Sequence, residues 1–138
     1  MKYEEDLKQY FDEYDYDWSI ISSLEGLPEE VIREYQYKVD WRTVSENQSL
    51  SENFIREFQD KVDWFFISTN QVLSEPFIEE FKDMVNWKAI SISQPLSFSF
   101  IMKHRGMIDV GYLMKNPNIH LDEDKKVELF TYLKLIKN

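Results

Sequence analysis

The chain has 138 residues, a formal net charge of −10 and no cysteine, which excludes disulfide scaffolds, thiol nucleophiles and cysteine-ligated zinc sites. An apolar fraction of 43% can supply a packed core, and three glycines are too few for a turn-rich all-β fold or a glycine-rich phosphate loop. Residues 1–86 hold 21 acids and 8 bases, a field that repels nucleic acid. The N-terminus lacks the apolar segment of a signal peptide, so we expect one cytoplasmic domain over residues 1–138, without membrane or direct nucleic-acid contact.

The first 17 residues are rich in acids and read YEEDLKQYFDEYDYD from residue 3 to residue 17. We expect them to form an acidic N-terminal cap. Acids alternate here with tyrosines, a pattern that favours docking on a basic protein surface, although a charge run is more often simply solvated. The candidate partner-binding residues in this segment are Asp12, Glu13, Tyr14, Asp15 and Tyr16.

Residues 18–115 repeat with a period of 23 residues. Each of the four tryptophans follows an Asp or Asn, in the pairs Asp17-Trp18, Asp40-Trp41, Asp63-Trp64 and Asn86-Trp87. An aliphatic residue, a serine, a glutamine or glutamate, and a leucine recur at fixed distances after each tryptophan. A fifth unit keeps the acid at Asp109 and has Val110 in the tryptophan position. So many aligned positions at one period indicate a tandem repeat.

Each repeat is predicted to contain two short helices. In the third repeat, apolar residues recur on one face of residues 51–62, and Ser51 suits the N-cap, which predicts a first helix of about 10–12 residues. Asp63 is predicted to cap a second helix of about 7–9 residues, with Trp64 and Ile67 on one face.

Stacked helix pairs can bury apolar faces that a single pair leaves exposed. The predicted fold class is therefore all-α, an α-solenoid of four to five two-helix repeats with a C-terminal capping helix. Residues 116–138 break the period and are predicted to form this helix. Asp122 would cap it, and Val127, Phe130 and Leu133 would form the apolar stripe that packs on the last repeat.

The acid–tryptophan pairs could either bind a ligand or hold the repeats together. A row of indoles would suit stacking on bases, sugars or methylated cations. A tryptophan on the same helical face as a recurrent aliphatic residue is far more often part of the core, so we interpret all four pairs as structural. The recurrent Gln48, Gln71 and Gln94 are interpreted similarly, as partners for backbone groups of the turns.

Positions that vary between repeats are the candidates for partner contact. Directly after the tryptophan most repeats have a polar or small residue, whereas the third has Phe65 and Phe66. If exposed, this pair would anchor an interface; if buried, it would extend the core, and both interpretations stay open. The recurrent Glu34, Glu57 and Glu80 form either a solvated row or an acidic ridge for a basic partner.

The two histidines, His104 and His120, match no metal-ligand spacing. His104 occupies the position held by Tyr35, Phe58 and Phe81 in earlier repeats, so we expect a half-buried helix residue. No catalytic site, metal or cofactor is expected, because the sequence contains no nucleophile motif, phosphate loop or metal cluster.

The units LSENFIREFQDKVDWFFISTNQ and LSEPFIEEFKDMVNWKAISISQ resemble the short helical repeats that occur in tandem in proteins of bacteriophages and large DNA viruses. The resemblance covers residues 17–115 and brings no catalytic residues with it. A phage setting implies a comparison with small acidic inhibitors of host defence such as anti-CRISPR proteins, many of which cover a basic nucleic-acid channel or block a subunit contact.

Two functions are therefore expected as alternatives. The first is inhibition of a host nucleic-acid-handling defence complex, acting sterically through an acidic surface. The second is a non-enzymatic adaptor or scaffold that binds a peptide or partner helix through the varied positions of the second helices. An open end of the stack would permit a homodimer.

Overall fold

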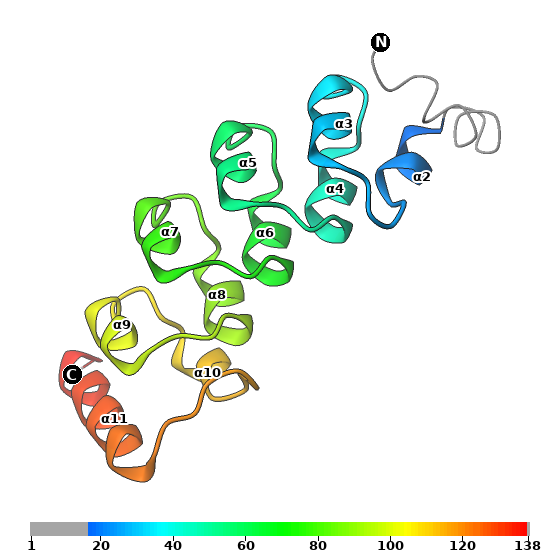
Figure 1. The fold of residues 1–138 in the computed structure, drawn as a ribbon. Helices are drawn as coiled ribbons and strands as arrows, with labels where there is room; N and C mark the ends of the chain where they lie inside the picture. The colour runs from blue at the N-terminus through cyan, green and yellow to red at the C-terminus, as the bar shows by residue number, and fades with distance from the viewer. Residues whose placement is uncertain (1–16, 138) are drawn as a thin grey trace. The chain divides into compact units, whose positions relative to one another are not determined.

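The computed structural model describes residues 17–137, which form helices and turns without a strand, so the predicted all-α class is confirmed (Figure 1). The chain divides into two compact units, Met1–Gln71 and Val72–Asn138. The described helices of the first unit are α2 (Trp18–Ser22), α3 (Glu29–Glu34), α4 (Trp41–Asn47), α5 (Glu52–Glu57) and α6 (Trp64–Asn70). Those of the second unit are α7 (Glu75–Glu80), α8 (Trp87–Ser93), α9 (Phe98–Lys103), α10 (Val110–Leu113) and α11 (Glu123–Lys137).

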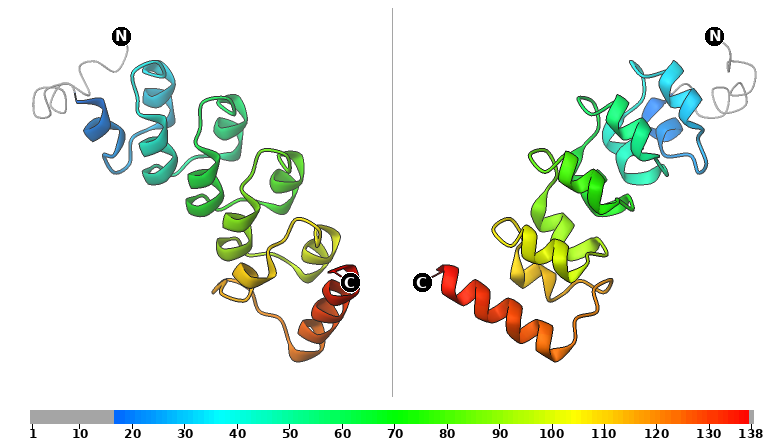
Figure 2. Two further views of the ribbon diagram at one scale, coloured as in Figure 1. Left: turned by 180° about the vertical axis from the view of Figure 1, so that it is seen from behind. Right: turned by 60° about the vertical axis from the view of Figure 1, so that its left-hand side comes forward.

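The second helices of successive repeats pack side by side within each unit. In the first unit α2 lies against α4 and α4 against α6, and in the second unit α8 lies against α10 (Figures 1 and 2). The chain is thus a tandem helical repeat of the α-solenoid class. Helices α4, α6 and α8 all begin at the tryptophan and have seven residues, within the predicted length.

The N-caps explain why the first helix of each repeat begins where it does. Ser51, Ser74 and Ser97 accept a hydrogen bond from the backbone N–H three residues later, and Pro28 takes the same position before α3. The apolar residues three and four positions after each cap point inward and are buried. These core pairs are Val31-Ile32, Phe54-Ile55, Phe77-Ile78 and Phe100-Ile101.

The first helix of each repeat is shorter than predicted, six residues in α3, α5, α7 and α9 instead of about ten or more. Phe58 shows the reason, because its φ of −106° and ψ of 29° lie outside the α region and end α5. A separate turn follows, in which the N–H of Lys61 and of Val62 donate to the Phe58 carbonyl. The apolar spacing that predicted one helix is thus shared between a helix and a turn.

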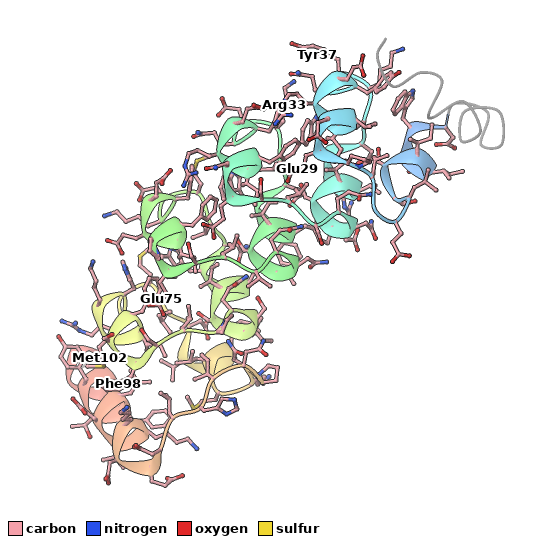
Figure 3. All side chains as sticks on the ribbon, viewed as in Figure 1. Glu29, Arg33, Tyr37, Glu75, Phe98 and Met102 are labelled. Atoms are coloured by element: carbon pink, nitrogen blue, oxygen red, sulfur yellow. The ribbon has the colours of Figure 1, made fainter. Side chains whose placement is uncertain are left out.

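The capping helix is confirmed as α11, but two of the three residues of its predicted apolar stripe face solvent, and the side chain of the third, Leu133, lies outside the described part of the structure. Val127 and Phe130 are 62% and 45% exposed, whereas Leu129 is fully buried. The rotation of α11 is set by contacts with α9 and the turn after it: Lys125 lies over the Phe98 ring, and the Arg105 guanidinium lies 3.9 Å from the centre of the Tyr132 ring. Phe98 on α9 lies beside α11 in Figure 3. A helix with apolar residues on more than one face can turn only one of them inward.

Candidate protein-binding surface

The second helix of each repeat begins at a side-chain cap. Asp63 accepts hydrogen bonds from the backbone N–H of Phe65 at 3.0 Å and of Phe66 at 3.3 Å. The equivalent caps of the other repeats, each accepting from backbone N–H groups of its own helix, are Asp17, Asp40 and Asn86. These bonds satisfy the first donors of each helix, which gives the recurrent acids a structural role.

The tryptophans join successive helices at the edge of the core. Trp41 stacks on Phe54 and on Phe58, with ring centres 6.2 Å and 5.0 Å apart, and its indole N–H donates to the Gln36 carbonyl at 2.9 Å. Trp18 packs likewise on Tyr35. All four tryptophans, Trp18, Trp41, Trp64 and Trp87, are only half-buried, so the interpretation as core anchors requires a correction. In Trp41, the hydrogen bond from the indole N–H to the Gln36 carbonyl keeps one edge of the ring near the surface, where the turn lies.

The recurrent glutamines connect one repeat to the preceding one. Gln71 is buried; its amide NH₂ donates to the carbonyls of Ser45 at 3.1 Å and Gln48 at 2.6 Å, and its oxygen accepts from the Leu50 N–H at 3.0 Å. Gln48 makes the equivalent three bonds to the repeat before it. A single buried side chain thus satisfies three backbone groups of a turn.

Asn116 takes over this role at the end of the repeats, which the sequence did not indicate. Its amide NH₂ donates to the carbonyls of Ser91 at 2.8 Å and Gln94 at 2.9 Å. The glutamine period would place the next amide at residue 117, which is proline. Asn116 lies one residue before the position that the period predicts, and it is an asparagine instead of a glutamine. The repeat pattern therefore does not identify it.

Helices α4 and α6 bring an aromatic pair and an arginine together at the surface of the first unit. Phe65 is 51% exposed and packs edge-to-face on the half-buried Phe66, with ring centres 5.2 Å apart. The Arg42 guanidinium of α4 lies 5.3 Å from the centre of the Phe66 ring, and Ile20 of α2 is 40% exposed. We call Ile20, Arg42, Phe65 and Phe66 the aromatic surface. Exposure of Phe65 favours the interface interpretation over the core interpretation.

The second unit does not repeat this cluster at the matching positions. In α8 these positions hold the exposed Lys88 and the buried Ala89, and in α10 they hold Gly111 and Tyr112. The aromatic surface therefore belongs to the first unit alone among the residues described.

One of the recurrent acids Glu34, Glu57 and Glu80 forms an ion pair between repeats. Glu57 accepts from the Arg33 Nε at 2.7 Å and 3.2 Å, and this hydrogen bond raises the pKa of Arg33. Glu34, which is half-buried, lies in the first unit, and the exposed Glu80 lies in the second. With one carboxylate of the row paired to an arginine of the same chain, the row is less acidic than its sequence indicates.

A second recurrent glutamate links the first helices of successive repeats, a role that was not predicted. The Glu29 carboxylate accepts from the backbone N–H of Ser51 at 2.6 Å and from its hydroxyl at 3.0 Å. Glu75 makes the same two bonds to Ser97. Glu29 and Arg33, one turn apart on α3, both lie on its side toward α5 (Figure 3). The sequence did contain a signal for this role, because a glutamate recurs at the same 23-residue period as the capping serine.

His104 joins two repeats of the second unit and is buried rather than half-buried. Its ring stacks on Trp87, with centres 5.4 Å apart, and its Nε2 contacts the Glu79 carboxylate. The other Glu79 oxygen lies 3.3 Å from the Lys103 ammonium. Desolvation alone would raise the pKa of Glu79, but the hydrogen bonds from Lys103 and His104 outweigh it, so the pKa is lowered.

This lowered pKa predicts an acid-dependent loss of stability. Glu79 contributes fully to stability above pH 4.5, the ordinary pKa of a glutamate. This contribution is lost as the pH falls through the lower pKa of the folded state. The stability difference between wild type and Glu79→Gln should therefore be steady above about pH 5 and should shrink as the pH falls below 4.5 in urea unfolding. Asp83→Asn removes one negative charge from an exposed turn of the same repeat and is the control. Parallel pH profiles for wild type and Glu79→Gln would contradict the prediction.

The remaining predicted site residues, Asp12, Glu13, Tyr14, Asp15 and Tyr16, lie outside the described residues. Within residues 17–137, no three His, Asp or Glu side chains are grouped so that they could hold a metal ion. No helix in that same range is long and apolar enough to cross a membrane. Comparison with protein-family models, with curated proteins and with solved structures found no match.

Proposed function

We propose that this chain is a non-enzymatic helical-repeat protein that binds a partner protein through the aromatic surface. The observation that carries this proposal is Phe65, a large aromatic side chain that is half exposed on a short, well-capped helix. Exposed aromatic residues beside an arginine have the composition of interface hot spots.

The repeat itself does not require this phenylalanine. In α6 the cap is Asp63, the Trp64 indole N–H donates to the Gln59 carbonyl, and the buried face consists of Ile67 and Ser68. Arg42, which belongs to the preceding repeat, covers part of the neighbouring Phe66 ring and so holds the pair in place. Adjacent exposed aromatic groups that the scaffold does not require are typical of partner contact.

Charge and spacing indicate the kind of partner. Residues 17–71 hold 11 acids and 5 bases, so basic residues around an apolar anchor would complement this unit. Packed helices lie about 8–10 Å apart, close to the roughly 10.5 Å between residues i and i+7 of an α-helix. An amphipathic helix laid across α2, α4 and α6 would thus present one apolar residue to each, and we propose such a basic amphipathic helix as the bound element.

Capture from lysate with matched variants tests this function. The partner retained by the wild-type chain should bind Phe65→Ala at least about tenfold more weakly, as for a hot spot, and should stay bound at high salt. Val72→Ala, which truncates another exposed apolar residue, should bind like wild type. Equal affinity for Phe65→Ala and wild type would contradict the proposal.

A second candidate function is inhibition of a host nucleic-acid-handling defence complex through the acidic surface. The charge distribution favours it, because residues 1–71 hold 17 acids and 7 bases, whereas residues 72–138 hold nine of each. Binding of this kind should weaken steeply with salt and on charge reversal of Glu30 and Glu34, but not on Phe65→Ala. A nuclease-protection assay with CRISPR effectors tests it directly, and unchanged cleavage with every effector would contradict it.

A further inference from the structure

Helix α11 leaves an apolar stripe facing solvent on the end of the second unit. Val127 and Phe130, three residues apart, are 62% and 45% exposed, while the opposite face buries Leu129 against the fold. With 15 residues, α11 is the longest described helix, so its outward face spans several turns. Helical spacing of four and three residues places positions 123, 127 and 130 on this face.

The charge of the second unit permits a second copy to approach it. Residues 72–138 hold nine acids and nine bases, whereas residues 1–71 hold 17 acids and 7 bases. Two copies that meet through the first unit would therefore repel each other more strongly than two that meet through the second. The exposed apolar stripe thus lies in the unit whose own acids and bases balance.

The stripe suits a second copy of itself in only one direction. It begins with Glu123 and continues with Val127 and Phe130. Two antiparallel copies, related by a two-fold axis midway between Val127 and Phe130, place residue 127 of each opposite residue 130 of the other and keep the two Glu123 carboxylates at opposite ends. Parallel copies would place these two carboxylates together.

We propose that α11 binds a second copy of the chain in this antiparallel register and forms a weak, concentration-dependent dimer. An interface of this kind is isologous, so it closes at two copies and does not propagate. Glu123 lies 3.4 Å from Lys126 of its own helix, an exposed pair that can rearrange at little cost. The dimer uses a different unit from the aromatic surface and does not depend on the proposed function; it would present that surface twice and so raise avidity for a repeated partner.

Sedimentation equilibrium of the full chain tests the dimer. Between about 1 μM and about 1 mM, the average mass should rise from 16.8 kDa toward twice that value. Val127→Asp and Phe130→Asp should stay monomeric throughout, with unchanged circular dichroism because both side chains are exposed. Phe65→Asp is the control and should dimerise like wild type. A monomer at every concentration, unchanged dimerisation of Val127→Asp, or loss of the dimer in Phe65→Asp would each overturn the proposal.

Removal of a charge tests the register. Glu123→Gln should dimerise within about twofold of wild type, because the antiparallel register keeps residue 123 of the two copies apart. A severalfold tighter dimer of Glu123→Gln, as expected when repulsion between two facing carboxylates is relieved, would overturn the antiparallel register.

Discussion

Replacement of Gln71 by leucine is expected to lower the free energy of unfolding by about 3 kcal/mol, although leucine has a similar size. The change removes three hydrogen bonds and leaves the Leu50 N–H and the carbonyls of Ser45 and Gln48 without the amide. Each buried polar group that loses its partner costs about 1–3 kcal/mol, so part of the total is recovered wherever water reaches the turn. Urea unfolding followed by tryptophan fluorescence measures the effect.

The matched control is Gln36→Leu. Gln36 is half-buried and its side chain makes one described bond, to the Arg33 carbonyl at 3.0 Å, so the loss should stay near 1 kcal/mol. A cost for Gln71→Leu no larger than that of Gln36→Leu would show that the amides do not hold the repeats together. Because repeats contact only their neighbours, the damage should also lower the cooperativity of unfolding.

Replacement of Trp41 by alanine is expected to cost about 3 kcal/mol, the lower end of the range for large aromatic residues, because this indole is half-buried. The variant loses ring contacts with Phe54 and Phe58 and the hydrogen bond to the Gln36 carbonyl. Trp41→Phe keeps much of the stacking and isolates the hydrogen bond, with an expected cost of about 1 kcal/mol. Far-ultraviolet circular dichroism during urea unfolding gives both values.

Phe65→Ala is the control for loss of an aromatic side chain. Its exposed ring contributes little to the folded state, so its effect should stay within about 0.5 kcal/mol. A melting temperature that is unchanged in Trp41→Ala would remove the tryptophans from any structural role. A large loss in Phe65→Ala would instead assign this residue to the core and remove the basis for the aromatic surface.

Much of the fold follows from residues whose role depends only on their neighbours in sequence. Asp63 before a helical segment specifies a cap, and the aspartate carboxylate accepts from Phe65 and Phe66 as that position requires. The 23-residue period placed Gln71 in a turn, where it satisfies backbone groups. These roles depend on local geometry that is the same in each repeat, so repetition in the sequence reveals them.

Other features depend on dihedral angles and distances that the pattern of residues does not encode. The end of α5 at Phe58 results from a backbone conformation outside the α region, while the apolar spacing continues past it. Glu29 recurs as Glu52 and Glu75 at the 23-residue period, but only the structure shows that its carboxylate binds Ser51 of the next repeat. Asn116 lies one position out of step and serves as a glutamine substitute.

The sequence by itself determined the all-α class, the repeat length, the caps and the buried apolar positions, because all of these recur at a fixed period. Only the tertiary structure decided that Phe65 is exposed and that α11 turns Leu129 inward and Val127 and Phe130 outward. Periodicity shows that a helix has an apolar face, but the rotation of the helix is set by the contacts available on its neighbours. Both surfaces proposed to bind partners are therefore consequences of packing.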